Sequence, residues 1–259
     1  MTRRATDASP LAGWTVVSLR PRDQHAGLRA AAARAGARLL ALSPLAVETR
    51  TDAASRHALR EALAADLALF TSPNAVRAAA ALQRLANARG RPLLAVGDGT
   101  RRALQRLGVD AMSPTRMDSE GLLAMPALRD IAGRRVGLVT APGGRNRLVP
   151  SLRARGAEVR RADVYDRTPL VIAAARWRAL AAVLGTPEHV VLALSSTEAL
   201  DAMLRQRPAH LAQPLRPIAV SAASDRLAQA ARDAGFRRIA IAADARPATL
   251  LRAAADAFV

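Results

Sequence analysis

The stretch FTSPNAVRAAA, residues 70–80, marks the point where an apolar run ends and an alanine-rich segment begins. The run at residues 66–71 is short and apolar, as expected of a buried strand. Ser72 can cap a helix, and Pro73 suits the first helical position. Apolar residues then recur at helical spacing up to residue 89, and Gly90 is a natural helix end. The stretch therefore predicts a strand, a cap and a helix in succession.

The same pattern occurs again 124 residues later, where LSSTEAL occupies residues 194–200 and Ser196 corresponds to Ser72. Two more pairs of segments repeat at offsets of 124 and 120: Val96–Thr100 with Val220–Ser224, and Gly13–Val17 with Gly133–Gly137. Spacing shared over several segments indicates an ancient duplication, with copies at about 13–125 and about 133–259.

Each copy alternates predicted strands with predicted helices, which is the pattern of a parallel α/β sheet. The predicted strands cover residues 14–19, 38–42, 66–71, 92–96, 135–140, 158–165, 189–194, 217–221 and 238–242. The predicted helices cover residues 24–35, 52–64, 73–89, 100–107, 146–155, 170–184, 197–206, 224–234 and 247–258. The extended, proline-containing segments at about 43–49 and 163–169 are the candidate interdomain connections.

Composition favours a globular, intracellular protein. The 259 residues suffice for two modest domains, and 51% of them are hydrophobic. The absence of cysteine excludes disulfides and thiolate chemistry, and it suits a reducing compartment. The first twelve residues have no apolar core of a signal peptide, and the hydrophobic runs are too short to span a bilayer. These features predict a cytoplasmic protein that does not enter a membrane.

The charge is strongly positive, at +18, and every basic residue is Arg because the chain has no Lys. Two interpretations stay open: a solvated basic exterior, or an electropositive site for a polyanion. Nucleic acid is not the favoured polyanion, because no zinc-finger, basic-zipper or RNA-recognition pattern is present. The six aromatic residues are also too few for a base-stacking platform.

Small and hydroxyl-bearing residues follow the predicted strands, at the sheet edge where helix N-termini bind anions. They are Ser72, Gly97, Thr100, Gly144, Ser195, Ser196 and Ser224. A purely structural role is the alternative for each. Ser195 and Glu198 have the spacing of a capping box, and Gly97 can serve a tight turn. Arg102 stands where a dinucleotide-binding fingerprint requires glycine, so no NAD site is predicted.

Conventional catalytic motifs are missing from the sequence. The four histidines lack metal-ligand spacing, so we predict no metal site. Tyr165, the single tyrosine, is either a packing residue or a phenol that can donate a proton or a hydrogen bond. Arg20 and Arg145 are likewise either solvated cations or ligands for a carboxylate.

The ordered series of these segments resembles the uroporphyrinogen-III synthase family over nearly the whole chain. The segments are Leu19–Pro21, Phe70–Val76, Val96–Thr100, Ser119–Leu123, Gly143–Arg145 and Val164–Tyr165. The resemblance implies two flavodoxin-like or Rossmann-like α/β domains with parallel sheets, joined by a two-stranded extended connector. One domain then takes residues 1–45 with 168–259, the other takes 48–165, and each contains half of each repeat.

The resemblance also implies a function. Members convert hydroxymethylbilane, a linear polycarboxylate, into uroporphyrinogen III by loss of water, inversion of the last ring and closure, without metal or organic cofactor. Such a lyase of haem biosynthesis is expected to work as a monomer, with at most transient contact with the preceding pathway enzyme.

The resemblance assigns the small residues and arginines named above to substrate binding, and it assigns Tyr165 to loss of the hydroxyl. Ser196, Ser221 and Ala223 depart from the residues common in the family. A second hypothesis is therefore a degenerate module that binds a tetrapyrrole or another polyanion without catalysis.

Overall fold

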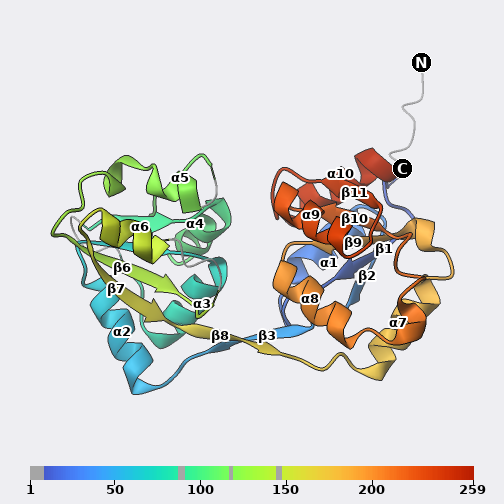
Figure 1. Ribbon diagram of the computed structural model, residues 1–259, viewed down its shortest axis with the longest axis horizontal. Helices are drawn as coiled ribbons and strands as arrows, with labels where there is room; N and C mark the ends of the chain where they lie inside the picture. The colour runs from blue at the N-terminus through green and yellow to red at the C-terminus, as the bar shows by residue number, and fades with distance from the viewer. Residues whose placement is uncertain (1–8, 87–90, 117–118, 144–147) are drawn as a thin grey trace, which may run out of the picture. The chain divides into compact units, whose positions relative to one another are not determined.

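The computed structural model describes residues 9–86, 91–116, 119–143 and 148–259. The chain divides into two compact units, each a parallel sheet with helices on both faces (Figure 1). Unit 1 contains Met1–Ala46 and Thr168–Val259, and unit 2 contains Val47–Arg167.

Unit 1 contains a five-stranded parallel sheet in the order β11-β10-β9-β1-β2. The strands are β1 (Thr15–Ser18), β2 (Arg38–Ala41), β9 (Val190–Leu194), β10 (Ala219–Ala222) and β11 (Arg238–Ile241). The helices are α1 (Ala26–Arg34), α7 (Ala174–Val183), α8 (Thr197–Gln206), α9 (Asp225–Asp233) and α10 (Pro247–Phe258), with short 3-10 turns at Pro187–His189 and Ala209–Leu211. Numbered by their order within the unit, the strands run 2-1-3-4-5, which is the flavodoxin-like order.

Unit 2 repeats this arrangement. Its parallel sheet has the order β5-β4-β6-β7, and an isolated bridge joins Leu94 of β5 to Met112 at the open edge. The strands are β4 (Leu67–Phe70), β5 (Leu93–Ala95), β6 (Arg135–Thr140) and β7 (Glu158–Asp163). The helices are α2 (Ala53–Leu63), α3 (Pro73–Leu82), α4 (Asp98–Gln105), α5 (Ser119–Leu123) and α6 (Leu148–Ala154), with a 3-10 turn at Pro126–Leu128.

The strand pairing distributes the two repeats over the two units. β1 and β2 of the first repeat share a sheet with β9 and β10 of the second, whereas β4 and β5 of the first share a sheet with β6 and β7 of the second. The chain changes units in β3 (Leu45–Thr49) and β8 (Tyr165–Pro169), which pair as a two-stranded sheet. Each compact unit therefore combines half of each repeat.

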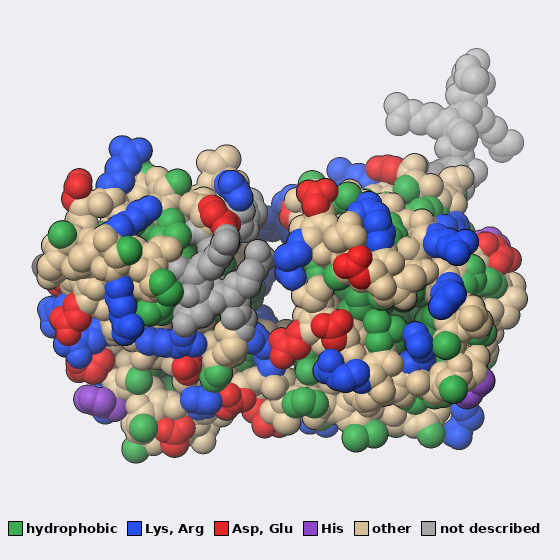
Figure 2. Space-filling view, in the orientation of Figure 1, with side chains coloured by type: hydrophobic (Ala, Val, Ile, Leu, Met, Phe, Trp, Pro, Cys, Tyr) green, Lys and Arg blue, Asp and Glu red, His purple; other side chains and the backbone are tan. Residues whose placement is uncertain are grey.

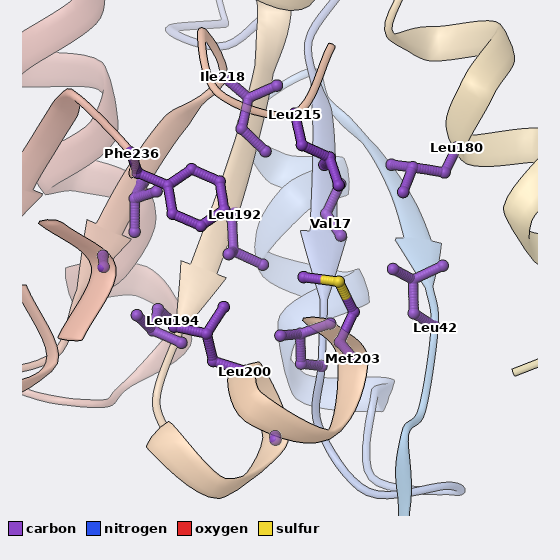
Figure 3. Packing of buried hydrophobic residues seen from close by; sticks show 14 of the residues in the cluster. Val17, Leu42, Leu180, Leu192, Leu194, Leu200, Met203, Leu215, Ile218 and Phe236 are labelled. Atoms are coloured by element: carbon purple, nitrogen blue, oxygen red, sulfur yellow. The ribbon is translucent and has the colours of Figure 1, made fainter. Parts of the chain in front are cut away.

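Each sheet separates two hydrophobic cores. In unit 1, one face of the sheet packs against α7, α8 and α9, and the other packs against α1 and α10. Figure 3 shows the first of these cores, where Leu192 and Leu194 of β9 lie among side chains such as Met203 and Phe236. In unit 2, α2, α3 and α4 cover one face, and α5 and α6 cover the other. Burial on both faces explains why the central strands β4 and β9 are continuously apolar, whereas the edge strand β7 is only partly buried and contains charged residues.

Helix α3 ends earlier than its apolar spacing predicts. The helix stops at Leu82, and Gln83 takes extended backbone with φ −161°. Arg56 of α2 donates a hydrogen bond to the Leu82 carbonyl at 2.9 Å, which satisfies one of the carbonyl groups left open at a helix end. The predicted end signal, Gly90, lies outside the described residues.

The remaining helical segments are either short or only partly described. Helix α5 at Ser119–Leu123 and the short turns were not predicted, because they are too brief to show periodicity. The predicted helix at 146–155 is described only from Leu148, and Pro150 lies in its first turn, where a missing backbone N–H costs no intrahelical bond.

A substitution at Gly137 in β6 tests how closely this strand packs against α2 in unit 2. A Cβ atom added there would overlap the backbone carbonyl of Ala62 in α2, and neither backbone can move freely. We expect Gly137→Ala to lower the free energy of unfolding by about 3 kcal/mol, as overpacking against rigid neighbours does. Urea denaturation measures the change.

Gly185→Ala is the matched control, because a Cβ atom there would meet only the Ala182 carbonyl oxygen at 3.5 Å, an ordinary contact. A change of less than about 1 kcal/mol is expected for it. Equal losses in the two variants would contradict the packing argument.

Candidate functional site

Both sheets have a switch point, where successive connections leave in opposite directions. Ligands of open α/β sheets bind at such points, outside the carboxyl ends of the strands. In unit 1 the switch lies between β1 and β9, and in unit 2 it lies between β6 and β4. The hydroxyl-bearing residues that follow these strands are therefore the first candidates for ligand contact.

Ser72 and Tyr165 meet at the edge of the unit 2 sheet. Ser72 follows β4 and caps α3, since its Oγ accepts a hydrogen bond from the Ala75 amide at 3.0 Å. The same Oγ lies 3.1 Å from the Tyr165 hydroxyl. Only 3% of Tyr165 is exposed, and its ring packs in the core beneath α2, α3 and α4. The Ser72 oxygen thus caps α3 and also contacts the hydroxyl of a buried phenol.

The switch point of unit 2 is held by further polar contacts. The Thr71 hydroxyl donates to the Thr140 hydroxyl at 2.8 Å, which joins the ends of β4 and β6. Arg167 donates to the Pro142 carbonyl at 3.0 Å, and its guanidinium carbon lies 6.0 Å from the centre of the Tyr165 ring. A cation at this distance is attracted to the electron-rich face of the ring.

Gly97 and Thr100 lie at the start of α4, also at the carboxyl edge of unit 2. Gly97 caps the helix with φ −172°, which is extended backbone open to any residue, so the turn does not itself require glycine. Thr100 is only 2% exposed. Between them, hydrogen bonds from Arg102 and Arg101 hold the pKa of Asp98 below its usual value. A bound carboxylate would compete with Asp98 for these two arginines.

The carboxyl edge of unit 1 has two capped helices. Ser196 follows β9 and accepts from the Ala199 amide at 3.2 Å, while Ser224 follows β10 and accepts from the Leu227 amide at 3.4 Å. Arg226 donates to the Thr197 hydroxyl at 2.8 Å and so links the two helix starts. Ser195 lies half-buried directly after β9.

Arg20 belongs to the same edge, because it follows β1. Its amide donates to the Ser18 hydroxyl at 3.4 Å, and its guanidinium donates to the Ala245 carbonyl at 2.9 Å. Ser18 is itself completely buried. The arginine therefore lies beside the switch point of unit 1, because it follows β1, one of the two strands that border this point.

One sequence-based assignment needs correction. Ser196, and not Ser195, caps α8, so Glu198 lies at the second helical position and the predicted capping box does not form. Ser221 lies within β10, in agreement with the predicted strand at 217–221, and its buried hydroxyl donates to the Leu250 carbonyl at 2.7 Å. Gly144 and Arg145 lie outside the described residues.

Sequence reasoning missed Thr71, Thr140 and Arg167 as site residues. Each lies within one or two positions of a strand end, yet their contacts join segments that are distant in the chain. One signal in the sequence could have indicated Thr140: it ends a predicted strand and lies three residues before Gly143. No local pattern identifies the partner of such a side chain.

Arginines are distributed over the exposed face in Figure 2, and acidic side chains lie among them. Several arginines form ion pairs, such as Arg50 with Asp166 at 2.7 Å and Arg161 with Asp163 at 3.0 Å. Within the described residues, no helix has the length and apolarity needed to cross a bilayer. In the same part of the chain, no three His, Asp or Glu side chains gather as metal ligands.

Comparison with known sequences identifies one family. The family model described as uroporphyrinogen-III synthase HemD matches residues 26–252. A uroporphyrinogen-III synthase of Salmonella typhimurium is 34% identical over 169 residues, which cover 61% of this chain and 65% of that protein. The Escherichia coli synthase is 34% identical over 143 residues, or 52% of this chain and 54% of that protein. The chain thus spans less than two thirds of the length of either relative.

Comparison with solved structures shows the fold. A mutant uroporphyrinogen III synthase of Thermus thermophilus superposes with a TM-score of 0.61 at 22% identity, over 95% of this chain and 98% of that one. Uroporphyrinogen-III synthetase of Helicobacter pylori gives a TM-score of 0.62 at 15% identity, over 94% and 99%. The predicted α/β class with two parallel sheets is confirmed.

The two contacts of the Ser72 oxygen, with the Ala75 amide and with Tyr165, predict a contribution to stability. We expect Ser72→Ala to lower the free energy of unfolding by about 2 kcal/mol, because it removes a helix cap and the hydrogen bond to Tyr165. Ser196→Ala removes an equivalent cap in unit 1 and is expected to cost about 1 kcal/mol. Urea denaturation of both variants makes the comparison, and equal losses would show that the phenol contact contributes nothing.

Proposed function

The chain belongs to the uroporphyrinogen-III synthase family, and from that premise we propose that it converts hydroxymethylbilane into uroporphyrinogen III in tetrapyrrole biosynthesis. The geometric observation that carries this proposal is the hydrogen bond between Tyr165 and Ser72 at the switch point of unit 2. We also propose that residues 1–45 with 168–259 and residues 48–165 are the two domains of the family.

The carboxyl edges of the sheets are suited to bind a polycarboxylate. Helix N-termini present backbone N–H groups and a partial positive charge, both of which favour carboxylates. In this proposal Ser72, Gly97 and Thr100 bind substrate in unit 2, together with Gly144 and Arg145. Arg20, Ser195, Ser196 and Ser224 do so in unit 1. Backbone donors explain how the family can tolerate wide changes of side chain.

Tyr165 is proposed to assist the first step, in which the substrate loses its hydroxyl group. The phenol donates its proton to the leaving hydroxyl, and the C–O bond breaks to release water. The pyrrole nitrogen gives up its proton to water, which leaves a neutral azafulvene, and the Tyr165 phenolate takes a proton back from water before the next turnover. If Ser72 donates its own proton to the phenol oxygen, the phenolic proton is free to face the substrate. The guanidinium of Arg167 lies 6.0 Å from the centre of the ring and is attracted to its electron-rich face.

Cyclisation is proposed to depend on positioning. The last ring can attack the azafulvene through either of its two α-carbons, and attack through the substituted carbon gives the spiro intermediate that leads to isomer III. Holding the reacting groups in place can contribute roughly 7–11 kcal/mol, and a preference of about 1.4 kcal/mol for one approach already gives tenfold selectivity. Such a reaction requires binding groups rather than a strong nucleophile.

We further propose that the protein acts as a cytoplasmic monomer that receives its unstable substrate by transient contact with the preceding pathway enzyme. The chain contains no cysteine, which suits a reducing compartment. Sedimentation equilibrium would reveal a dimer if the monomer assignment is incorrect.

Product analysis tests the reaction directly. Enzymatically generated hydroxymethylbilane is supplied to the protein, and the oxidised uroporphyrin isomers are separated. We expect isomer III well above the spontaneous background. Isomer I alone would support the alternative of a degenerate module that binds tetrapyrroles without catalysis.

Tyr165→Phe tests the role of the phenol. Loss of an acid catalyst lowers rates by about 100-fold or more, so we expect kcat to fall about 100-fold while KM changes less than about threefold. Single-turnover kinetics measures the step. Unchanged turnover would remove Tyr165 from the mechanism, and urea denaturation of the variant controls for loss of fold.

A further inference from the structure

His25 forms a polar bridge inside unit 1 that the proposed reaction does not account for. Its side chain is only 8% exposed, although the residue lies at the start of α1. Nδ1 lies 2.9 Å from the Ser18 hydroxyl, and Nε2 lies 2.7 Å from the Ser43 hydroxyl. The imidazole thus joins the carboxyl end of β1 to the segment that leads into β3.

A second contact joins the same two segments. The Arg22 amide donates to the Leu45 carbonyl at 2.9 Å, so residues 20–25 are tied at two points to residues 43–45. Arg20, the proposed carboxylate ligand at this edge, lies in this loop. Its amide shares the Ser18 hydroxyl with the imidazole.

Both segments contain backbone in an unfavourable conformation. Among the described residues, Asp23 and Ser43 are the two non-glycine residues with positive φ, at 67° and 47°. Left-handed backbone costs roughly 1–3 kcal/mol at such residues and persists where surrounding contacts impose it. Strain of this kind clusters at functional sites, and the imidazole bonds directly to one of the two strained residues.

The charges around His25 favour its neutral form. Burial is the main cause that lowers its pKa, and Arg29 of α1, Arg20 after β1 and Arg176 of α7 act in the same direction. Asp23 in the loop opposes them. A neutral imidazole donates through one nitrogen and accepts through the other, so it can bridge two hydroxyls without adding a buried charge.

We propose that His25 is a positioning residue, which clamps the loop that carries Arg20 against the start of β3 and so holds Arg20 in place to bind a substrate carboxylate. The role of Arg20 in binding a substrate carboxylate rests on the proposed function. The contacts by which His25 holds the loop do not depend on that function. A histidine that merely filled space in the core would have no specific effect on substrate affinity.

Hydrogen–deuterium exchange tests the clamp without any substrate. In His25→Gln we expect the Arg22 amide to exchange about tenfold faster than in the unaltered protein, because the loop loses its anchor. His57→Gln is the matched control, since His57 is an exposed histidine on α2 in the other unit. Unchanged exchange at Arg22 would overturn the proposal.

A double-mutant cycle tests whether His25 acts through Arg20. We expect Arg20→Gln and His25→Gln each to raise KM about tenfold, with kcat changed less than about twofold. The double variant should then have about the same KM as Arg20→Gln alone, because His25 affects substrate affinity only through the position of Arg20. Multiplicative effects, or an unchanged KM in either single variant, would overturn the action through Arg20.

The two experiments separate the possible failures. If the unaltered protein makes no isomer III, the proposed function fails and the exchange experiment still decides the clamp. If His25→Gln does not fold, Ser43→Gly replaces it, because it removes the Nε2 partner and suits the positive φ. Faster exchange at Arg22 in that variant supports the clamp, and unchanged exchange contradicts it.

The neutral imidazole also predicts a pH dependence of stability. The unfolded chain accepts a proton at the usual imidazole pKa of about 6.5, whereas the folded protein accepts it only at lower pH. The free energy of unfolding should therefore decrease as the pH falls through about 6.5 toward the lowered pKa of His25. This decrease should be weaker in His25→Gln and retained in His57→Gln, and identical curves for all three proteins would contradict the prediction.

Discussion

The backbone N–H groups at the start of a helix have no partners within the helix, and this constraint organises both sheet edges of the protein. Serine hydroxyls two residues after the strand ends satisfy some of these groups in α3, α8 and α9. The remaining N–H groups give each edge a partial positive charge that suits a carboxylate. The groups that terminate the strands and begin the helices are therefore also the groups proposed to bind substrate.

Ser72 illustrates how stability and chemistry depend on the same atom. Its oxygen caps α3 and contacts Tyr165, a buried phenol beneath the cation of Arg167. Because the hydroxyl lies 3.1 Å from the capping oxygen, the phenol oxygen is held at the start of α3. This is the kind of preorganisation expected where a reaction depends on position more than on a reactive side chain.

The loops at the carboxyl edge of the sheet are held by different side chains in the two units. In unit 2 the edge is held by hydroxyl contacts, by Arg167 and by the arginines around Asp98. In unit 1 a buried histidine joins the loop that carries Arg20 to the start of β3. The contacts at the sheet edges therefore differ between the units, although both sheets are parallel and have a switch point.

The sequence by itself determined the class of the fold, because buried parallel strands must be apolar and surface helices must show an apolar stripe. It also placed Ser72 and Ser224 at helix starts, since capping is a local interaction over three residues.

The family resemblance implied that each domain contains half of each repeat, but only the tertiary structure decided which strands pair, because local sequence contains no information about pairing. For the same reason it alone revealed the contacts of Tyr165 and His25 with serines 93 and 18 positions away. It also moved the cap of α8 from Ser195 to Ser196, where either serine satisfied the sequence pattern.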